Sequence, residues 1–102
     1  MFGIPNQSPQ IECSEARHMI KNEGGLLLDV RSPEEFARGS LPGSVNLPLQ
    51  NLHSSHEYLD KKRPIIVCCV SGARSAQAQM ALKNLGYDNV HNLGSVRKYL
   101  TC

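Results

Sequence analysis

The sequence predicts an α/β fold: a three-layer α/β/α arrangement with a mostly parallel central sheet of about five strands. Two observations predict it. Short apolar segments rich in Leu, Ile and Val alternate along the chain with segments of helical spacing, which is the order of β–α–β units. No Asn-Gly pair joins two apolar segments directly as a tight hairpin would, which favours parallel strands connected by helices.

At 102 residues the chain has room for one domain, expected to span 1–102 with residues 1–9 as a loosely held lead-in. A chain of this length can bury a core without disulfides or metal ions. The formal net charge of +2 is too small to indicate nucleic acid binding. No apolar run approaches the roughly 20 residues that span a bilayer. We therefore expect neither nucleic acid nor membrane as a partner.

Four cysteines stand at positions 13, 68, 69 and 102. Adjacent Cys68 and Cys69 are poorly placed to bridge, and the spacings match no zinc ligand set. We expect neither a disulfide framework nor a metal site. The first residues lack the basic and apolar regions of a signal peptide. These features predict a reducing, cytoplasmic location, although a mature chain restarted at an added methionine would look the same.

The expected elements follow one another without an internal repeat or linker. In chain order they are an edge strand at 10–12, a helix from Ser14 to about Asn22, a strand at 26–30, a helix from Ser32 to near Gly39, a strand at 45–47, a helical stretch at 53–59, a strand at 65–68, a helix at 76–85, a strand around Val90 and a last turn or helix at 94–100.

The helix near residue 33 has the clearest local signal. Ser32 supplies an N-cap, Pro33 fits the first helical position, and Glu35 stands at the N3 position that completes a capping box. Gly86 fits the position just after a later helix. Asp29 interrupts the strand that comes before the capping box, and a carboxylate late in a buried strand needs a partner.

The stretch 65–75 concentrates the chemistry of the chain. It begins as a β-branched run typical of a strand buried on both faces, breaks at Ser71-Gly72 and continues as a helix. Cys69 therefore lies at the carboxyl end of a parallel strand, the edge where open α/β sheets bind ligands. The N–H groups of such a loop favour an anion, and Arg74 adds positive charge. The pattern predicts a reactive thiolate at Cys69.

The rhodanese sulfurtransferases have an active loop that this chain resembles, with a Cys-x-x-Gly-x-Arg-Ser pattern at Cys69-Val70-Ser71-Gly72-Ala73-Arg74-Ser75. A second signature of the family is similar to the upstream residues Asp29-Val30-Arg31, Glu35-Phe36, Gly39, Pro42-Gly43 and Asn46-Leu47-Pro48. The two matches come in the expected order and cover most of the chain from about Gln10. The resemblance implies a rhodanese-like fold and a single-domain sulfurtransferase.

The resemblance also implies a covalent, two-step reaction without a cofactor. The Cys69 thiolate would take the outer sulfur of a thiosulfate- or persulfide-type donor, and a thiol or cyanide-like acceptor would remove it. Backbone N–H groups of the loop would stabilise the anion in both steps. Val70 and Ala73 make the loop apolar, with Arg74 as its only cation. This composition favours a persulfide donor or a protein sulfur acceptor.

The loop residues also have structural interpretations. A cysteine at a strand end is often a small buried apolar residue, and Gly72 is expected to take a positive φ. Arg74 is expected to favour the Cys69 thiolate and also to clamp the loop by pairing with Asp29 or Glu35.

Two hydroxyls and a second charged pair complete the expected site. Ser71 and Ser75 would donate hydrogen bonds toward the bound sulfur, although Ser75 fits a helix N-cap equally well. Asp29 and Arg31 end the neighbouring strand, where an ion pair that holds the loops together is the default expectation.

The chain departs from the family pattern in two places. Ser40 stands where the second signature often has His, which removes a general base that sulfur transfer from a thiolate does not require. Gly94-Ser95 and Tyr99 replace the Gly-Gly and Trp that are common near the end, so the wall on the acceptor side is not assigned. The histidines at 18, 53, 56 and 91 are scattered, and we expect them to be solvated rather than to bind metal.

Two alternatives to an efficient sulfurtransferase stay open. A sulfur carrier or binding module would load Cys69 and deliver the sulfur to a docked partner. A phosphatase of the same fold would use Cys68, because the loop from Cys68 to Arg74 has the Cys-x5-Arg length of rhodanese-fold phosphatases. Two features favour Cys69: Gly72 follows it by three residues, as the loops of both families commonly require, and Cys68 continues the strand.

Overall fold

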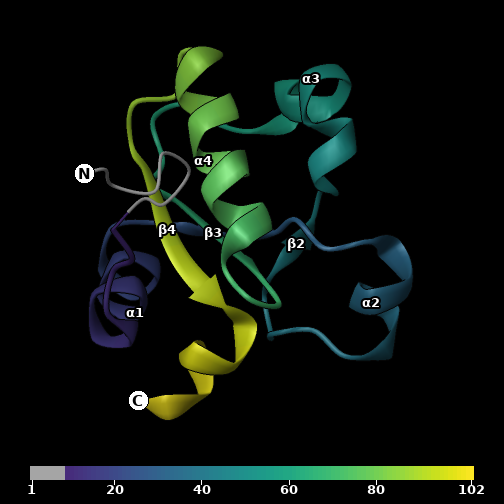
Figure 1. The fold of residues 1–102 in the computed structure, drawn as a ribbon. Helices are drawn as coiled ribbons and strands as arrows, with labels where there is room; N and C mark the ends of the chain where they lie inside the picture. The colour runs from purple at the N-terminus through teal and green to yellow at the C-terminus, as the bar shows by residue number, and fades with distance from the viewer. Residues whose placement is uncertain (1–8) are drawn as a thin grey trace, which may run out of the picture.

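The computed structural model describes residues 9–102, which form an α/β fold around one parallel sheet (Figure 1). In chain order its elements are α1 (Cys13–Asn22), β1 (Leu26–Asp29), α2 (Pro33–Arg38), β2 (Val45–Asn46), the 3-10 helix η1 (Leu49–Asn51), α3 (Leu52–Ser55), the 3-10 helix η2 (His56–Tyr58), β3 (Ile65–Cys69), α4 (Ala73–Asn84), β4 (Val90–Ser95) and the 3-10 helix η3 (Val96–Thr101).

The four strands lie in the order β2-β1-β3-β4, and every neighbouring pair is parallel. The expected fold class is confirmed. The strand expected at 10–12 is reduced to one bridge between Gln10 and Asn92, which accounts for a sheet of four strands rather than about five.

Strand β3 lies between β1 and β4, and all five of its residues are buried. Side chains of a strand alternate between its two faces. Ile65, Val67 and Cys69 join the core on one face, whereas Ile66 and Cys68 join the core on the other. The two adjacent cysteines therefore belong to different cores.

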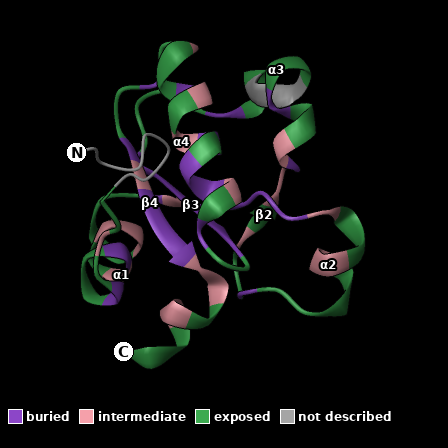
Figure 2. Ribbon diagram, viewed as in Figure 1, coloured by how far each residue is buried: buried purple, intermediate pink, exposed green. Residues whose placement is uncertain are grey.

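Helices cover both faces of the sheet, and the buried residues are concentrated in β3 and β4 between them (Figures 1 and 2). One core includes Leu52 of α3 with Ala78 and Leu82 of α4. The other includes Ala16 of α1, with Tyr99 of η3 packed against it. No helix within residues 9–102 has the length and apolar character to cross a bilayer.

The capping box at the start of α2 is confirmed. Ser32 Oγ accepts a hydrogen bond from the N–H of Glu35 at 3.2 Å, and Glu35 Oε1 accepts one from the N–H of Ser32 at 2.9 Å. The expected start of α1 was wrong by two residues: Glu12 rather than Ser14 is its N-cap, because Glu15 accepts the N–H of Glu12.

A disulfide joins Cys13 in α1 to Cys102 at the end of the chain, with their Cα atoms 6.0 Å apart. The expectation that the cysteines form no disulfide was wrong for this pair. The two residues are 89 positions apart and meet because η3 returns to pack on α1, which spacing cannot show. Arg17 supports this contact by donating to the carbonyl of Tyr99 at 2.6 Å. The cysteine pattern therefore no longer argues for a reducing location.

Candidate active site

The connection between β3 and α4 directs backbone N–H groups at one sulfur atom. β3 ends at Cys69, and Gly72 turns the chain into α4 with the expected positive φ, +101°. Cys69 Sγ accepts hydrogen bonds from the N–H of Gly72 at 2.9 Å and of Ser75 at 3.4 Å. Because Cys69 is buried, these groups rather than bulk water surround the sulfur. The arrangement suits negative charge on sulfur.

Ser75 is buried in the first turn of α4, beside the sulfur. Its Oγ donates to the carbonyl of Gly72 at 3.0 Å and accepts the Cys69 thiol at 3.5 Å. The interpretation of Ser75 as the N-cap was wrong, since Gly72 occupies that position. Ser71 is exposed, and in the described part of the chain no hydrogen bond joins it to Cys69.

Arg74 clamps the loop to α2. Its Nη1 donates to Glu35 Oε1 at 2.7 Å and its Nη2 to Oε2 at 3.0 Å, which is a bidentate pair. The hydrogen bonds from Arg74 hold the pKa of Glu35 down at about 2, and Glu35 raises the pKa of Arg74. The expected clamp is therefore made with Glu35 rather than Asp29. The carboxylate compensates much of the charge that Arg74 would otherwise present to a substrate.

A second ion pair is buried at the end of β1. Arg31 donates to Asp29 from its backbone N–H at 2.9 Å and from its guanidinium, whose shortest bond is 2.7 Å. The guanidinium also donates to the carbonyl of Gly39, just after α2, at 2.8 Å. Within residues 9–102 neither member bonds to Cys69. This geometry favours the structural role that was the default expectation for the pair.

Cys68 has different surroundings from Cys69. It is buried on the opposite face of β3, and its thiol lies 3.6 Å from the carbonyl of Leu28. Burial raises the pKa of the Cys68 thiol to about 12, with the charge of Asp29 adding to the effect. Cys68 is therefore a thiol near neutral pH, and the loop is built around Cys69.

Two residues that sequence reasoning missed lie beside the loop. The side chain of Gln10 packs against the backbone of Gly72 and of Gly94: a Cβ added to Gly72 would stand 2.7 Å from Gln10 Nε2, and one added to Gly94 would stand 2.5 Å from Oε1. Lys98 of η3 donates from Nζ to Gln10 Oε1 at 3.4 Å. No motif points to either residue; only the expected edge strand at 10–12 placed Gln10 near the sheet.

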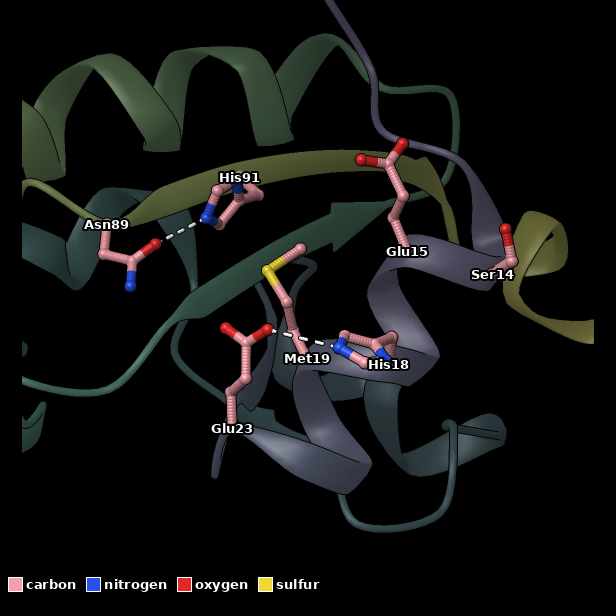
Figure 3. A pocket seen from close by; sticks show the side chains of 7 residues that line it. All are labelled: Ser14, Glu15, His18, Met19, Glu23, Asn89 and His91. Carbon is pink, nitrogen blue, oxygen red and sulfur yellow. Dashed lines mark hydrogen bonds and ion pairs between the residues drawn. The ribbon is translucent and has the colours of Figure 1, made fainter.

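A separate hollow of about 450 Å³ lies between α1 and the start of β4, at the other end of β4 from the loop (Figure 3). Its lining residues are Ser14, Glu15, His18, Met19, Glu23, Asn89 and His91. The imidazoles already have partners, since His91 bonds to Asn89 and His18 pairs with Glu23. Among the described residues no group of His, Cys, Asp and Glu is arranged to hold a metal ion. The lining of the hollow includes no cysteine, so the hollow is separate from the Cys69 loop.

The histidines, expected to be solvated, are not all alike. His18 and His53 are exposed, and His91 is half-buried. Burial lowers the pKa of His91. The side chain of His56 lies outside the described residues.

Comparison with known proteins identifies the family. The family model of the rhodanese-like domain matches residues 12–101. The chain belongs to the rhodanese-like domain family. The fold and the family expected from the loop motif are both confirmed.

Several of the similar proteins are named sulfurtransferases. A sulfurtransferase of Allochromatium vinosum is 36% identical over 80 residues, which cover 78% of this chain and 75% of that protein. The human thiosulfate:glutathione sulfurtransferase is 29% identical over 108 residues and covers 91% of this chain and 94% of its own. The solved structure of a human single-domain sulfurtransferase matches with a TM-score of 0.76 at 28% identity. The match covers 92% of this chain and 96% of the human chain.

Proposed function

We propose that this chain is a sulfurtransferase that carries a sulfane sulfur as a persulfide on Cys69. The relatives named as sulfurtransferases support sulfur transfer in general. The observation that carries the persulfide proposal is the pair of N–H groups, from Gly72 at 2.9 Å and Ser75 at 3.4 Å, that converge on Cys69 Sγ. Donors placed in this way stabilise an anionic sulfur without reorganising.

The proposed reaction has two displacement steps at sulfur. In the first, the Cys69 thiolate attacks the outer sulfur of a thiosulfate- or persulfide-type donor. A bond forms between Sγ and that sulfur, the donor's S–S bond breaks, and the electron pair leaves with sulfite or a thiolate. In the second step a thiol or cyanide-like acceptor attacks the outer sulfur, and Cys69 leaves as the thiolate. Neither step consumes an oxidant or a reductant.

The rest of the loop would shape the site around this sulfur. The Ser75 hydroxyl lies 3.5 Å from Sγ and would turn toward the anion once the thiol proton has left. The Arg74–Glu35 pair would hold the loop in place. Val70 and Ala73 are exposed on the loop, with 48% of Val70 accessible. They form an apolar mouth for the substrate.

Mass spectrometry of the intact protein tests the proposal. After incubation with thiosulfate, the wild type should gain the mass of one sulfur atom, and cyanide should remove it. Cys69→Ser should lose this addition, whereas Cys68→Ser, the matched control on the other face of β3, should keep it. Transfer that survives Cys69→Ser would overturn the proposal. Hydrolysis of an aryl phosphate that survives Cys69→Ser but not Cys68→Ser would instead show that the phosphatase alternative is right.

The carrier alternative differs from the enzyme in turnover only. The half-exposed, apolar Val70 beside a buried Cys69 is a surface that a protein acceptor could contact. A burst of one sulfur per protein, without steady turnover on small acceptors, would favour a carrier. Sustained turnover on a small thiol or on cyanide would favour the enzyme.

A further inference from the structure

The arginine of the loop and the arginine that follows β1 are both paired with carboxylates. Arg74 is paired through both terminal nitrogens with Glu35, at 2.7 and 3.0 Å. Arg31 is buried and paired with Asp29 at 2.7 Å. The loop residues 70–73 carry no charge. A substrate with an anionic group next to its reactive sulfur would therefore find little uncompensated positive charge on the loop, and removing such a group from water without a partner is costly.

Lys98 is a cation near the loop that has no carboxylate partner among the described residues. It lies in η3, which follows the carboxyl end of β4 and so reaches the same edge of the sheet as the loop. Its side chain is half-buried, and its Nζ donates to Gln10 Oε1 at 3.4 Å. In the part of the chain that the structure describes, Lys98 forms no ion pair. Its charge is therefore available to a ligand.

Gln10 connects Lys98 to the loop. Its amide occupies a notch between Gly72 and Gly94, where a Cβ on either glycine would stand within 2.7 Å of the amide atoms. Both glycines have positive φ, +101° and +92°. Gly72 is also the residue whose N–H donates to Cys69 Sγ at 2.9 Å. One amide side chain and one backbone residue thus separate the charge of Lys98 from the reacting sulfur.

We propose that Lys98 binds the anionic group of a thiosulfonate-type sulfur donor, and that Gln10 is the residue that positions it. The inference rests on the proposed sulfur transfer through Cys69 and assigns the residues that bind the donor's anionic group at that same site. When the donor's S–S bond breaks, the electron pair leaves with the sulfur that bears the oxygen atoms. An ammonium beside that group stabilises both the bound donor and the departing anion.

The test compares two donors in the same assay. Thiosulfate carries an anionic sulfonate group next to its reactive sulfur, and an alkyl persulfide has no such group. Lys98→Met should lower kcat/KM for thiosulfate about tenfold, a fold-change typical of one lost charged contact. The kcat/KM for the alkyl persulfide should stay within about twofold of the wild-type value. Raising the ionic strength should lower the wild-type kcat/KM for thiosulfate, because salt screens the attraction between Lys98 and the donor. The difference in kcat/KM between the wild type and Lys98→Met should therefore become smaller.

Arg97→Met is the matched control. It removes one positive charge from the neighbouring, exposed position of η3, so the kcat/KM for both donors should be unchanged. Gln10→Leu should raise KM for thiosulfate, and the double variant of Gln10 and Lys98 should be no worse than Lys98→Met alone. Lys98→Arg should restore part of the thiosulfate activity, since it restores the charge.

Three results would overturn this inference. They are unchanged thiosulfate kinetics in Lys98→Met, an equal loss with both donors, and the same loss in Arg97→Met. The first result would show that Lys98 does not bind the donor, and the second that its role is structural. The third would show that the effect comes from the net charge of the protein. A wild type that forms no persulfide from either donor would instead refute the proposed function, so the two failures are distinguishable.

Discussion

Replacing Asp29 with Asn should cost more stability than any change at the half-buried clamp between Arg74 and Glu35. The Asp29 carboxylate accepts the backbone N–H of Arg31 and its guanidinium. The side chains of Asp29 and Arg31 are only 1% and 9% exposed. Asn keeps the shape of Asp29 but removes its charge and turns an amide donor toward Arg31.

Removing one partner of a buried pair costs about 3–5 kcal/mol. Arg31 keeps its bond to the carbonyl of Gly39 at 2.8 Å, so we expect a loss near the lower end, about 3 kcal/mol. For a protein of about 100 residues this corresponds to a fall in Tm of roughly 12–24 °C.

Urea unfolding at neutral pH measures the effect. Arg31→Met and the double variant of Asp29 and Arg31 complete a double-mutant cycle, and the double variant should recover part of the loss because no buried charge is left unpaired. A loss below about 1 kcal/mol for Asp29→Asn, the value of an exposed pair, would refute the burial argument. Unchanged unfolding with abolished sulfur transfer would show that Asp29 acts in the reaction.

Three further predictions concern the loop, the clamp and the disulfide. Ser75→Ala should slow persulfide formation and cost about 1 kcal/mol of stability; an unchanged rate would remove its hydroxyl from the mechanism. The pKa of Glu35 in the folded protein, about 2, lies below its ordinary 4.5, so its ion pair stabilises fully above pH 4.5 and is lost as the pH falls toward 2. Urea midpoints of the wild type and Glu35→Gln should converge over that range, and midpoints that stay equally far apart would contradict the assignment. Cys102→Ser should cost up to about 4–5 kcal/mol for a loop of 89 residues, and a reductant should destabilise the wild type but not this variant.

Local patterns in the sequence were enough to predict the fold and the backbone geometry of the loop at the centre of the candidate site. The β-branched run of β3, the capping box at Ser32 and the positive φ of Gly72 depend on neighbours within a few residues, so they can be identified without knowing the fold. Cys69 could be placed at the carboxyl ends of the strands because it ends a predicted parallel strand, and ligand-binding loops of parallel sheets lie at those ends.

Contacts between distant segments could not be predicted in this way. Glu35, rather than Asp29, pairs with Arg74 because α2 lies against the loop, which only the folded chain shows. The positions of Gln10 and Lys98 depend on both ends of the described chain meeting at the same edge. Ser75 was ambiguous because a serine three residues into a helix and a serine at its start look alike in sequence.

The neighbouring cysteines make the identity of the nucleophile depend on strand register. Cys68 and Cys69 face opposite sides of β3, and a shift of a strand by one residue turns every side chain to the other face. The pairing of β3 with β4 already contains an irregularity between Val67 and Cys68. A deletion of one residue at the start of β3 that was absorbed by such a shift would turn each thiol to the opposite face of the sheet, so Cys69, the proposed nucleophile, would lie in the other core. Which thiol faces the loop is thus set by the backbone pairing of β3 with its neighbouring strands as much as by the identity of the side chain.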